Sequence, residues 1–294
     1  MGNSLILTDR RNRTSSTVPP PTLTVSIVTY RPDLALFDAT LRKLSASFAM
    51  AREAGLLRAV NLVLIDNTGE RAVADAVVRL GVAHFDSSAV TMNYLHGHAN
   101  IGYGTAHNLV MHGGNTHFHL VLNPDVEVAE EALSAALHFL EENEHIGVIV
   151  PATVSRDGAR EYTCKRYPRV LDLALRGFAP YFLQRLFRKR LDHYEMRDLI
   201  GEAVVSPVPI MSGSFMLIRR KAIESTGGFD PNFFLYFEDF DWSVRLNRIT
   251  KSAYVPTVRV VHHGGRAARK GLRHIAYFVR SGVRFFNKHG WKWA

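Results

Sequence analysis

The sequence predicts an α/β protein in which helices cover both faces of a mostly parallel sheet. Between residues 23 and 150, short runs of β-branched and apolar residues alternate with stretches whose apolar residues recur every three or four positions. Polar residues directly follow three of the strand-like runs. Because parallel sheets bind ligands at the carboxyl ends of their strands, these polar residues mark the expected site.

The first predicted strand covers residues 23–30, whose unbroken apolar and β-branched character is typical of a strand buried on both faces. A helix follows from Pro32, with apolar residues at Leu34, Phe37, Leu41, Leu44 and Phe48. The remaining elements are predicted, in order, as a strand at 60–65, a helix at 70–80, a helix from Tyr103, a strand at 118–122, a helix at 129–143 and a strand at 146–150.

The bulk properties indicate a globular protein. At 294 residues, the chain can bury a full core in one large domain or two small ones. The single cysteine, Cys164, excludes an internal disulfide and fits a reducing cytosol. No segment has the ~18–20 continuous apolar residues of a membrane-spanning helix. Residues 1–21 are expected to form a flexible basic leader, since arginines there precede three consecutive prolines.

The formal net charge of +9 is unevenly distributed. No Asp or Glu follows Asp241, whereas twelve Lys or Arg do, and without those twelve the chain would carry −3. Such asymmetry indicates an anionic partner, which can be nucleic acid, a phosphorylated substrate or acidic lipid. Aromatic residues interleaved with these cations favour a membrane surface. We therefore expect a basic amphipathic helix at 266–294, a merely solvated basic face being the alternative.

The segment 162–206 interrupts the strand–helix alternation and is expected to be an insertion on the acceptor or membrane side. Leu183, Leu186, Phe187 and Leu191 share one helical face, and basic residues surround that face. A basic amphipathic helix is typical of a membrane-surface or partner-binding element. An ordinary packed helix is the alternative interpretation.

The first of two acidic clusters follows the strand predicted at 118–122. It contains Asp125 and Glu127 in the sequence Asn123-Pro124-Asp125-Val126-Glu127. A carboxylate at this position can bind Mg²⁺ or Mn²⁺ together with phosphate oxygens, and the cation would draw charge from a departing nucleoside diphosphate. A simple Asn-Pro-Asp turn is the alternative.

The second acidic cluster contains Glu238, Asp239 and Asp241 and opens a short helical stretch. Three acids within four residues exceed what one helix cap needs. Beside aromatic residues such as Tyr236 and Trp242, one of these acids can act as a general base or anchor an acceptor hydroxyl. Capping alone is the alternative.

Two further motifs are candidates for contact with phosphate. The run Asn100-Ile101-Gly102-Tyr103-Gly104 permits close backbone approach at a helix start, although it lacks the third glycine of the dinucleotide template. Tight helix packing is its alternative role. His262 and His263 follow a β-like run, and either imidazole can join a metal or a diphosphate.

In their order along the chain, these motifs resemble family 2 glycosyltransferases, most closely the bacterial rhamnosyltransferases of surface-polysaccharide assembly. The likeness covers roughly residues 23–265 and rests on Val25-Ser26-Ile27-Val28-Thr29-Tyr30, Asp66-Asn67, Asn100-Ile101-Gly102, Asn123-Pro124-Asp125, Ser212-Gly213-Ser214, Gly228-Phe229-Asp230, Glu238-Asp239-Phe240-Asp241 and His262-His263-Gly264-Gly265. It implies a GT-A fold over 22–265 and inversion at the anomeric carbon.

The resemblance also implies roles for individual residues. Asp66 would contact the pyrimidine of the donor, beside the turn at Thr29, Tyr30 and Arg31. Further donor contacts are expected from Asn67, Asn100, Gly102, Asn123, Asp125, Gly213 and Ser214. Asp125 corresponds to the last acid of the metal-binding D-x-D motif, whose first acid is replaced here by Asn123.

On the acceptor side, Asp239 matches the catalytic base, with Glu238 before it. Tyr236, Asp241 and Trp242 are expected to bind the acceptor, and His262 or His263 is expected to approach the Mg²⁺ or Mn²⁺ ion. The implied donor is dTDP-L-rhamnose and the implied acceptor is a polyprenyl-diphosphate-linked saccharide. Such an enzyme would be cytoplasmic and peripheral on the inner face of the bacterial plasma membrane.

Three alternatives stay open at this point. Within the family, the donor can be a UDP- or GDP-sugar carrying a hexose or galactofuranose. A nucleotidyltransferase is disfavoured because the turn at 29–33 lacks glycine. A non-catalytic module that binds membrane or nucleic acid would leave the carboxylates at the strand ends unexplained, so no nucleic-acid partner is expected. The oligomeric state is not predicted.

Overall fold

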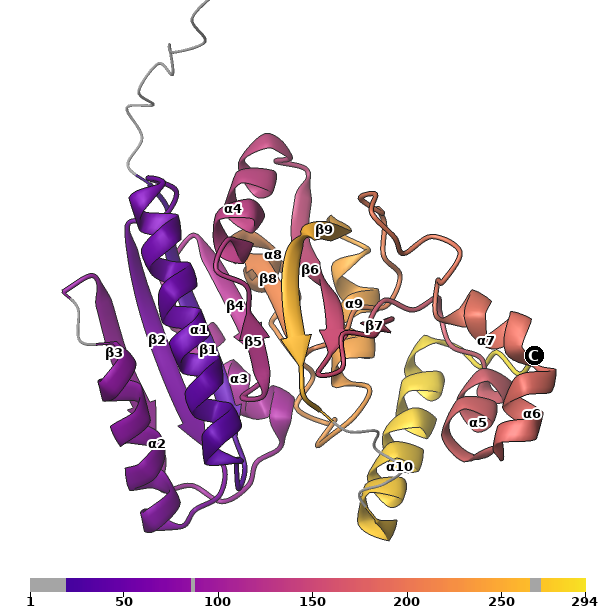
Figure 1. Ribbon diagram of the computed structural model, residues 1–294. Helices are drawn as coiled ribbons and strands as arrows, with labels where there is room; N and C mark the ends of the chain where they lie inside the picture. Colours follow the sequence, from indigo (N-terminus) through magenta and orange to yellow (C-terminus); the bar gives the residue numbers. More distant parts are fainter. Residues whose placement is uncertain (1–19, 86–87, 265–270) are drawn as a thin grey trace, which may run out of the picture.

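The computed structural model describes residues 20–85, 88–264 and 271–294, and these residues form one sheet flanked by helices (Figure 1). Along the chain the elements are β1 (Thr22–Thr29), α1 (Leu34–Glu53), β2 (Ala59–Asp66), α2 (Arg71–His84), β3 (Val90–Leu95), α3 (Tyr103–Met111), β4 (Phe118–Leu122), β5 (Val126–Val128), α4 (Ala132–Glu142), β6 (Ile146–Ser155), β7 (Arg160–Glu161), α5 (Val170–Phe178), α6 (Tyr181–Leu186), α7 (Arg188–Tyr194), β8 (Phe215–Arg219), α8 (Arg220–Thr226), α9 (Glu238–Leu246), β9 (Lys251–His262) and α10 (Leu272–His289).

The strand order is β3-β2-β1-β4-β8-β6-β9-β5, with β7 paired to β6. The pairs β1–β2 and β1–β4 are parallel, as predicted, and β3, which the sequence analysis did not predict, also pairs parallel with β2. Every residue of β4 is buried, and so are seven of the eight residues of β1, which explains their unbroken apolar sequences. The register places Thr29 opposite Asp66, so the carboxyl ends of β1 and β2 lie level.

Beyond β4 the sheet changes character. Strand β8 pairs antiparallel with both β4 and β6, and β5 pairs antiparallel with β9, so the sheet as a whole is mixed rather than mostly parallel. The sequence analysis did not predict β8, because its five residues end in an arginine and show no alternation of polar and apolar residues. Its β-structure depends on neighbours nearly a hundred residues away.

The helices follow the predicted periodicity where they pack on the sheet. Helix α1 buries Phe37, Leu41, Leu44 and Phe48, and the carboxylate of Asp33 caps its start by accepting hydrogen bonds from two backbone N–H groups. Predicted elements at 60–65, 70–80, 118–122 and 146–150 correspond to β2, α2, β4 and β6. The first half of the chain therefore folds as its sequence pattern predicts, apart from the strands β3 and β5.

The segment 162–206, which interrupts the strand–helix alternation, lies beside the C-terminal helix. Helices α5, α6 and α7 form the central part of the segment 162–206 and stand beside α10, at the end of the molecule opposite α2 and β3 (Figure 1). The helix predicted around 183–191 is divided into α6 and α7 at Phe187. Helix α10 lies within the predicted helix at 266–294, although 266–270 fall outside the described residues, as do residues 1–19 of the leader. Among the described helices, none is long and apolar enough to cross a membrane.

Candidate functional site

Asp66 lies at the carboxyl end of β2 and is fully buried. One carboxylate oxygen, Oδ1, accepts hydrogen bonds from the Thr29 hydroxyl and from the backbone N–H of Thr68, each at 3.1 Å. The other oxygen, Oδ2, is buried without a hydrogen-bond partner. Because buried polar atoms nearly always have a partner, Oδ2 is placed to accept a hydrogen bond from a ligand.

The rest of the predicted turn lies more openly. Tyr30 is 53% exposed, and Arg31 adopts a left-handed backbone conformation with φ 46°. The Arg31 guanidinium pairs with Glu70 at 2.9 Å, and its pKa is raised by that hydrogen bond. Tyr30 and Arg31 therefore lie at the surface beside Asp66, whereas Asp66 itself is buried.

The loop at 100–102 is held by its own hydrogen bonds. The Asn100 side chain accepts from the backbone N–H of Gly102 at 3.0 Å, and the Asn67 side chain donates to the Gly102 carbonyl at 3.1 Å. Gly102 has φ 87°, and a Cβ there would lie 2.4 Å from the carbonyl oxygen of Phe234. The close approach that this glycine permits is therefore to the chain just before α9, as expected for tight packing.

Tyr103 joins the donor side to the acidic cluster, a role that the sequence analysis missed. Its hydroxyl lies 2.9 Å from the Asn123 side-chain oxygen and 2.7 Å from the Gly213 carbonyl. Burial raises the pKa of Tyr103 well above its usual value, and the neighbouring carboxylates of Glu238, Asp239 and Asp125 raise it further, so the hydroxyl stays protonated. Only its place at the start of α3, after the glycine, could have indicated this contact.

The segment at 212–214 completes this connection. The backbone N–H of Asn123 donates to the Ser214 carbonyl at 2.9 Å, which continues the pairing of β4 with β8. The backbone N–H of Gly213 donates to Asp239 Oδ2 at 3.0 Å. A Cβ on Gly213 would lie 3.3 Å from the Cβ of Asp239, so a larger residue would crowd the acid. The predicted residues Asn123, Gly213, Ser214 and Asp239 are thus brought together.

Asp125 lies beyond β4 and faces one of the two candidate histidines. Its Oδ1 is buried, has no hydrogen-bond partner among the described residues, and lies 3.7 Å from His262 Nε2. The other ring nitrogen of His262 is 3.2 Å from Glu161 of β7. His263 instead points its Nε2 at Glu127, 2.8 Å away, while its backbone N–H donates to the Asp125 carbonyl. The geometry therefore separates the two histidines, and His262 is the one beside the Asp125 carboxylate.

The Asp125–His262 pair fits a divalent cation in part. Among the described residues, no group of three or more His, Cys, Asp or Glu side chains is arranged to hold a metal ion. The pair offers one unbonded carboxylate oxygen and one imidazole nitrogen, and the Glu161–His262 contact resembles the carboxylates that orient metal-bound histidines. Diphosphate oxygens and water would have to supply the remaining ligands, which is usual for Mg²⁺.

Asp239 and Glu238 begin α9 and differ in their surroundings. Asp239 is partly exposed, and its two oxygens accept hydrogen bonds from the backbone N–H groups of Gly213 and Phe240 at 3.0 and 2.9 Å. Burial raises the pKa of Asp239 to about 6, against the opposing effect of these N–H donors. Glu238 is 5% exposed, its Oε2 has no partner, and burial followed by repulsion from Asp239 raises its pKa well above the usual value.

The backbone before α9 is strained. Tyr236 and Phe237 both have positive φ, at 67° and 64°, a conformation that side-chain-bearing residues rarely adopt. Such strain concentrates at functional sites, where surrounding packing maintains it. Here Phe237 packs against Phe240, Phe278 and Phe285. The strained turn sets where α9 begins and therefore where Asp239 points.

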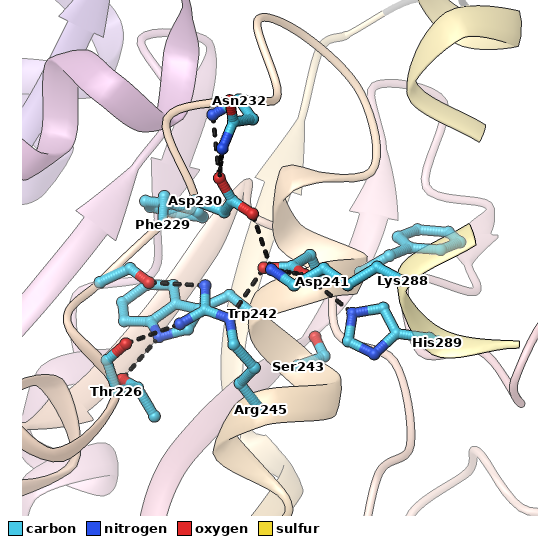
Figure 2. Close-up of polar contacts among 12 residues, drawn as sticks. Thr226, Phe229, Asp230, Asn232, Asp241, Trp242, Ser243, Arg245, Lys288 and His289 are labelled. Atoms are coloured by element: carbon cyan, nitrogen blue, oxygen red, sulfur yellow. Dashed lines mark hydrogen bonds and ion pairs between the residues drawn. The ribbon is translucent and has the colours of Figure 1, made fainter. Parts of the chain in front are cut away.

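Two residues predicted to bind the acceptor, Asp241 and Trp242, are buried, and Figure 2 shows the polar contacts around them. Asp241 is fully buried and pairs with Arg245, Lys288 and His289 at 2.8, 2.7 and 2.8 Å. Trp242 is also fully buried, and its indole N–H donates to Thr226 at 2.9 Å. The periodicity of a helix explains both positions, since residues three and four apart from Glu238 turn inward with it.

The third predicted acceptor residue, Tyr236, lies at a boundary with α10. Its hydroxyl is 2.8 Å from His274 Nδ1, and its side chain is partly exposed. Tyr236 is therefore the one member of the predicted acceptor set that reaches the surface next to Asp239.

A parallel half-sheet with polar strand ends, joined at its edge to a carboxylate-bearing helix, is the architecture of a GT-A glycosyltransferase. Residues 20–274 match the family described as "Glycosyltransferase like family 2", and the chain belongs to this family. Its membership confirms the enzyme class and the family resemblance seen in the sequence.

Curated relatives are rhamnosyltransferases. The chain is 28% identical over 284 residues to the N-acetylglucosaminyl-diphospho-decaprenol L-rhamnosyltransferase of Mycobacterium tuberculosis, covering 92% of this chain and 86% of the relative. It is 25% identical over 148 residues to the rhamnosyltransferase WbbL of Escherichia coli K12, covering 49% of this chain and 51% of that protein.

Two solved structures share the fold. GalNAc-T7, with UDP, GalNAc and Mn²⁺, superposes with a TM-score of 0.61 at 15% identity and covers 91% of this chain, which spans 48% of that one. The mannosyltransferase PcManGT from Pyrobaculum calidifontis, with GDP-mannose and Mn²⁺, has a TM-score of 0.56 at 16% identity, covering 90% of this chain and 65% of its own. These likenesses confirm the GT-A fold.

Proposed function

We propose that the protein is an inverting glycosyltransferase that moves L-rhamnose from dTDP-L-rhamnose to a polyprenyl-diphosphate-linked saccharide. The product would enter a bacterial surface polysaccharide such as O-antigen. The observation that carries the proposal is the connection from Asn123, at the end of β4, through Gly213 to the carboxylate of Asp239. The names of the curated relatives support the choice of rhamnose and of a lipid-linked acceptor.

The donor base would lie at the ends of β1 and β2. Asp66 Oδ2 is buried and unbonded, so it can accept the N3–H group of thymine. Thr29 holds the other Asp66 oxygen, which fixes the carboxylate before the ligand arrives. Uracil presents the same N–H group, so this contact suits either pyrimidine nucleotide.

The donor diphosphate would lie towards Asp125 and His262. A Mg²⁺ or Mn²⁺ ion held by these two residues would supply positive charge to the leaving diphosphate. Asp125 offers an unbonded buried oxygen for this purpose, and Glu161 keeps the His262 ring turned towards Asp125. The Mn²⁺ in both structural neighbours supports the same choice of ion.

The chemical step would use Asp239 as the general base. Its carboxylate accepts the proton of the acceptor hydroxyl, and the hydroxyl oxygen forms a bond to C1 of the sugar. The bond from C1 to the diphosphate oxygen breaks on the opposite face, so the configuration at C1 inverts. The two backbone N–H groups on Asp239 favour its ionised form, whereas burial and repulsion from Asp239 raise the pKa of Glu238 well above its usual value and disfavour its ionised form.

Nucleotide-dependent melting tests this proposal. A ligand that binds the folded state raises the melting temperature by mass action. We expect dTDP with Mn²⁺ to raise it, and EDTA to remove most of that gain. Replacing Asp66 with alanine should reduce the shift at a given dTDP concentration, while the exposed-acid variant Glu224→Gln should keep it. A preference for UDP or GDP would redirect the donor sugar, and no response to any nucleotide would overturn the proposed function.

A further inference from the structure

Two segments that are distant in sequence expose most of the large hydrophobic side chains of the protein. Of the seventeen such side chains that are exposed in the described residues, ten come from 178–187 and 272–293. Helix α6 has no buried residue at all, and Tyr181, Phe182 and Leu186 on it are 79, 68 and 74% exposed. Exposed hydrophobic side chains gathered in this way mark a surface that meets an apolar partner.

The two segments adjoin in the fold. The ring of Phe178, at the end of α5, lies 6.1 Å from the ring of Phe278 on α10. The backbone N–H groups of Val170 and Leu171, at the start of α5, donate to the carbonyls of Lys292 and Trp293 at 2.8 and 3.1 Å. Figure 1 shows α5, α6 and α7 grouped beside α10 and the C-terminus. We call this group of elements the α6–α10 surface.

On α10 the exposed hydrophobic residues follow helical spacing. Leu272, Val279 and Val283 are 85, 51 and 44% exposed, and their spacing of seven and four residues places them on one face of the helix. Beyond the helix, the indole rings of Trp291 and Trp293 stack at 4.9 Å and are 40 and 64% exposed. Indole rings at an apolar boundary are typical of side chains that rest in the headgroup layer of a bilayer.

The charge on the α6–α10 surface is positive. Arg185 and Lys189 are exposed on α6 and α7, and Arg273 and Arg280 are exposed on α10. No acidic residue occurs between 173 and 191, or anywhere after Asp241. The nearest acids are engaged, since Asp172 pairs with Arg190 and Asp192 pairs with Arg188 and Arg197. An anionic partner is therefore complementary to this surface.

We propose that the α6–α10 surface docks on an anionic lipid bilayer, with its aromatic and aliphatic side chains in the headgroup layer and its cations against lipid phosphates. This mixture of aromatic rings, aliphatic side chains and cations on short helices suits a bilayer interface better than a folded protein partner. At a bilayer interface, apolar side chains enter the acyl boundary while cations stay beside the lipid phosphates. The inference rests on the proposed function in one respect: a lipid-linked acceptor is held in a bilayer, so the enzyme would have to reach it there.

The docking surface is joined to the catalytic helix. Lys288 and His289 of α10 bind Asp241 of α9, and the Ser281 hydroxyl donates to the Leu235 carbonyl just before the strained turn at 236–237. A bilayer held against α6 and α10 would therefore lie beside the acceptor side of Asp239. A saccharide on a polyprenyl diphosphate would approach the site from that bilayer.

Vesicle binding of the full-length protein tests the inference. The wild type should co-sediment with vesicles of phosphatidylglycerol and phosphatidylcholine, and much less with phosphatidylcholine alone. The double variant Phe182→Ser with Leu186→Ser should bind the anionic vesicles at least ten-fold more weakly. A control variant, Val82→Ser with Leu109→Ser, removes side chains that are 54 and 51% exposed on α2 and α3, and should bind like the wild type.

A second variant tests the electrostatic attraction to anionic lipid. Replacing Arg185 and Lys189 with glutamine should weaken binding to anionic vesicles and reduce its dependence on salt. Equal binding by all variants, or binding that ignores lipid charge, would overturn the inference. So would a stable dimer in solution whose formation is lost in the Phe182→Ser, Leu186→Ser variant, because a second copy would then cover this surface.

The proposed function can fail separately. Nucleotide-dependent melting needs no lipid, so a protein that binds anionic vesicles through α6 but no nucleotide would keep the docking inference and lose the proposed chemistry. If both hold, the Phe182→Ser, Leu186→Ser variant should transfer sugar at the wild-type rate to a short-chain soluble acceptor. It should transfer more slowly to a polyprenyl-linked acceptor in vesicles.

Discussion

The donor half and the acceptor half of the site are built in different ways. Around β1, β2 and β4, polar residues follow strands directly, and Thr29 and Asp66 meet because their strands are paired in register. Around α9, the acidic cluster is held by side chains from α10, such as His289, which is 48 residues from Asp241. The donor half depends on sheet register, whereas the acceptor half depends on buried charge and on packing against a distant helix.

Asp239 and Asp241 show the difference within one helix. Asp239 is held by backbone N–H groups and stays partly exposed, so its carboxylate can meet a substrate. Asp241 is enclosed by Arg245, Lys288 and His289 and has no exposed surface. Replacing each residue in turn tests whether Asp239 acts in catalysis and Asp241 in stability.

The largest effect is expected from Asp239→Asn. Asparagine keeps the size of the side chain but cannot accept a proton, and general-base catalysis contributes about 10²–10⁴-fold in rate. Turnover measured by release of dTDP should fall by that factor, while nucleotide binding is retained. In the wild type, turnover should rise with pH through about 6, because the base must be deprotonated. Near-normal turnover by the variant would remove Asp239 from the mechanism.

The next effect is expected from Asp241→Ala, and it concerns stability. The variant leaves the side chains of Arg245, Lys288 and His289 without their carboxylate partner, and removing one partner of a buried ion pair typically costs about 3–5 kcal/mol in the free energy of unfolding. Urea denaturation measures this loss. The matched control is Asp38→Ala, whose partner His84 and carboxylate are partly exposed, and which should cost less than about 1 kcal/mol. Equal losses in the two variants would contradict a special role for the buried cluster.

On the donor side, Asp66→Ala should weaken dTDP binding by about 10–100-fold. The variant removes a carboxylate oxygen that is buried and ready to accept a hydrogen bond, and hydrogen bonds to charged groups contribute about 1.5–3 kcal/mol. Isothermal titration calorimetry measures the affinity. Glu70→Ala, which removes only the exposed partner of Arg31, should leave the affinity within about two-fold of wild type because exposed ion pairs contribute little. Unchanged binding by Asp66→Ala would place the base elsewhere.

The smallest expected effect is a loss of stability at low pH, caused by two buried histidines that contact Ser26 of β1. Ser26 Oγ lies 2.6 Å from His107 Nδ1 and 2.7 Å from His119 Nε2, and all three residues are fully buried. Burial lowers the pKa of His107 to about 3 and that of His119 well below its usual value. Below about pH 6.5 the unfolded chain therefore binds protons that the folded protein excludes, so stability declines as the pH falls.

Proton uptake by Asp239 and Glu238, whose pKa values burial raises, would stabilise the folded protein over the same pH interval, so the histidines are tested in the Glu238→Gln, Asp239→Asn variant. In this variant we expect the free energy of unfolding to fall by about 1 kcal/mol between pH 7 and pH 6, as measured by urea denaturation at each pH. Adding His138→Gln, at an exposed histidine, should leave the slope unchanged. Stability of this variant that is flat or rising over the interval would mean that the buried histidines take up protons in the folded protein.

Much of the donor half could be predicted because its signals are local. The apolar run at 23–30, the helix periodicity after Pro32 and the acids that follow strands are all visible within a few residues. The structure confirms these strands and brings Thr29 to Asp66. The strand pairing beyond β4 was not predictable in this way, since β8 joins partners from distant parts of the chain.

The acceptor half was predicted only in part. The acidic cluster was visible in the sequence as an excess of carboxylates, yet the sequence did not show which of them would be buried and which exposed. Tyr103 and Glu161 gave no signal, because their importance depends on a contact with Asn123 and on a contact with His262. A cationic C-terminal segment was visible, but its role in enclosing Asp241 was not.

By itself, the sequence determined the parallel half-sheet, the acids at its strand ends and the uneven charge, because each of these follows from short-range periodicity or from composition. Only the tertiary structure decided that His262 rather than His263 faces Asp125, and that Asp241 and Trp242 are buried. The physical reason is that successive residues of a strand point to opposite faces, whereas residues three and four apart on a helix share one face. Which face is buried depends on what packs there: α10 covers Asp241, and Phe229 and Thr226 contact Trp242.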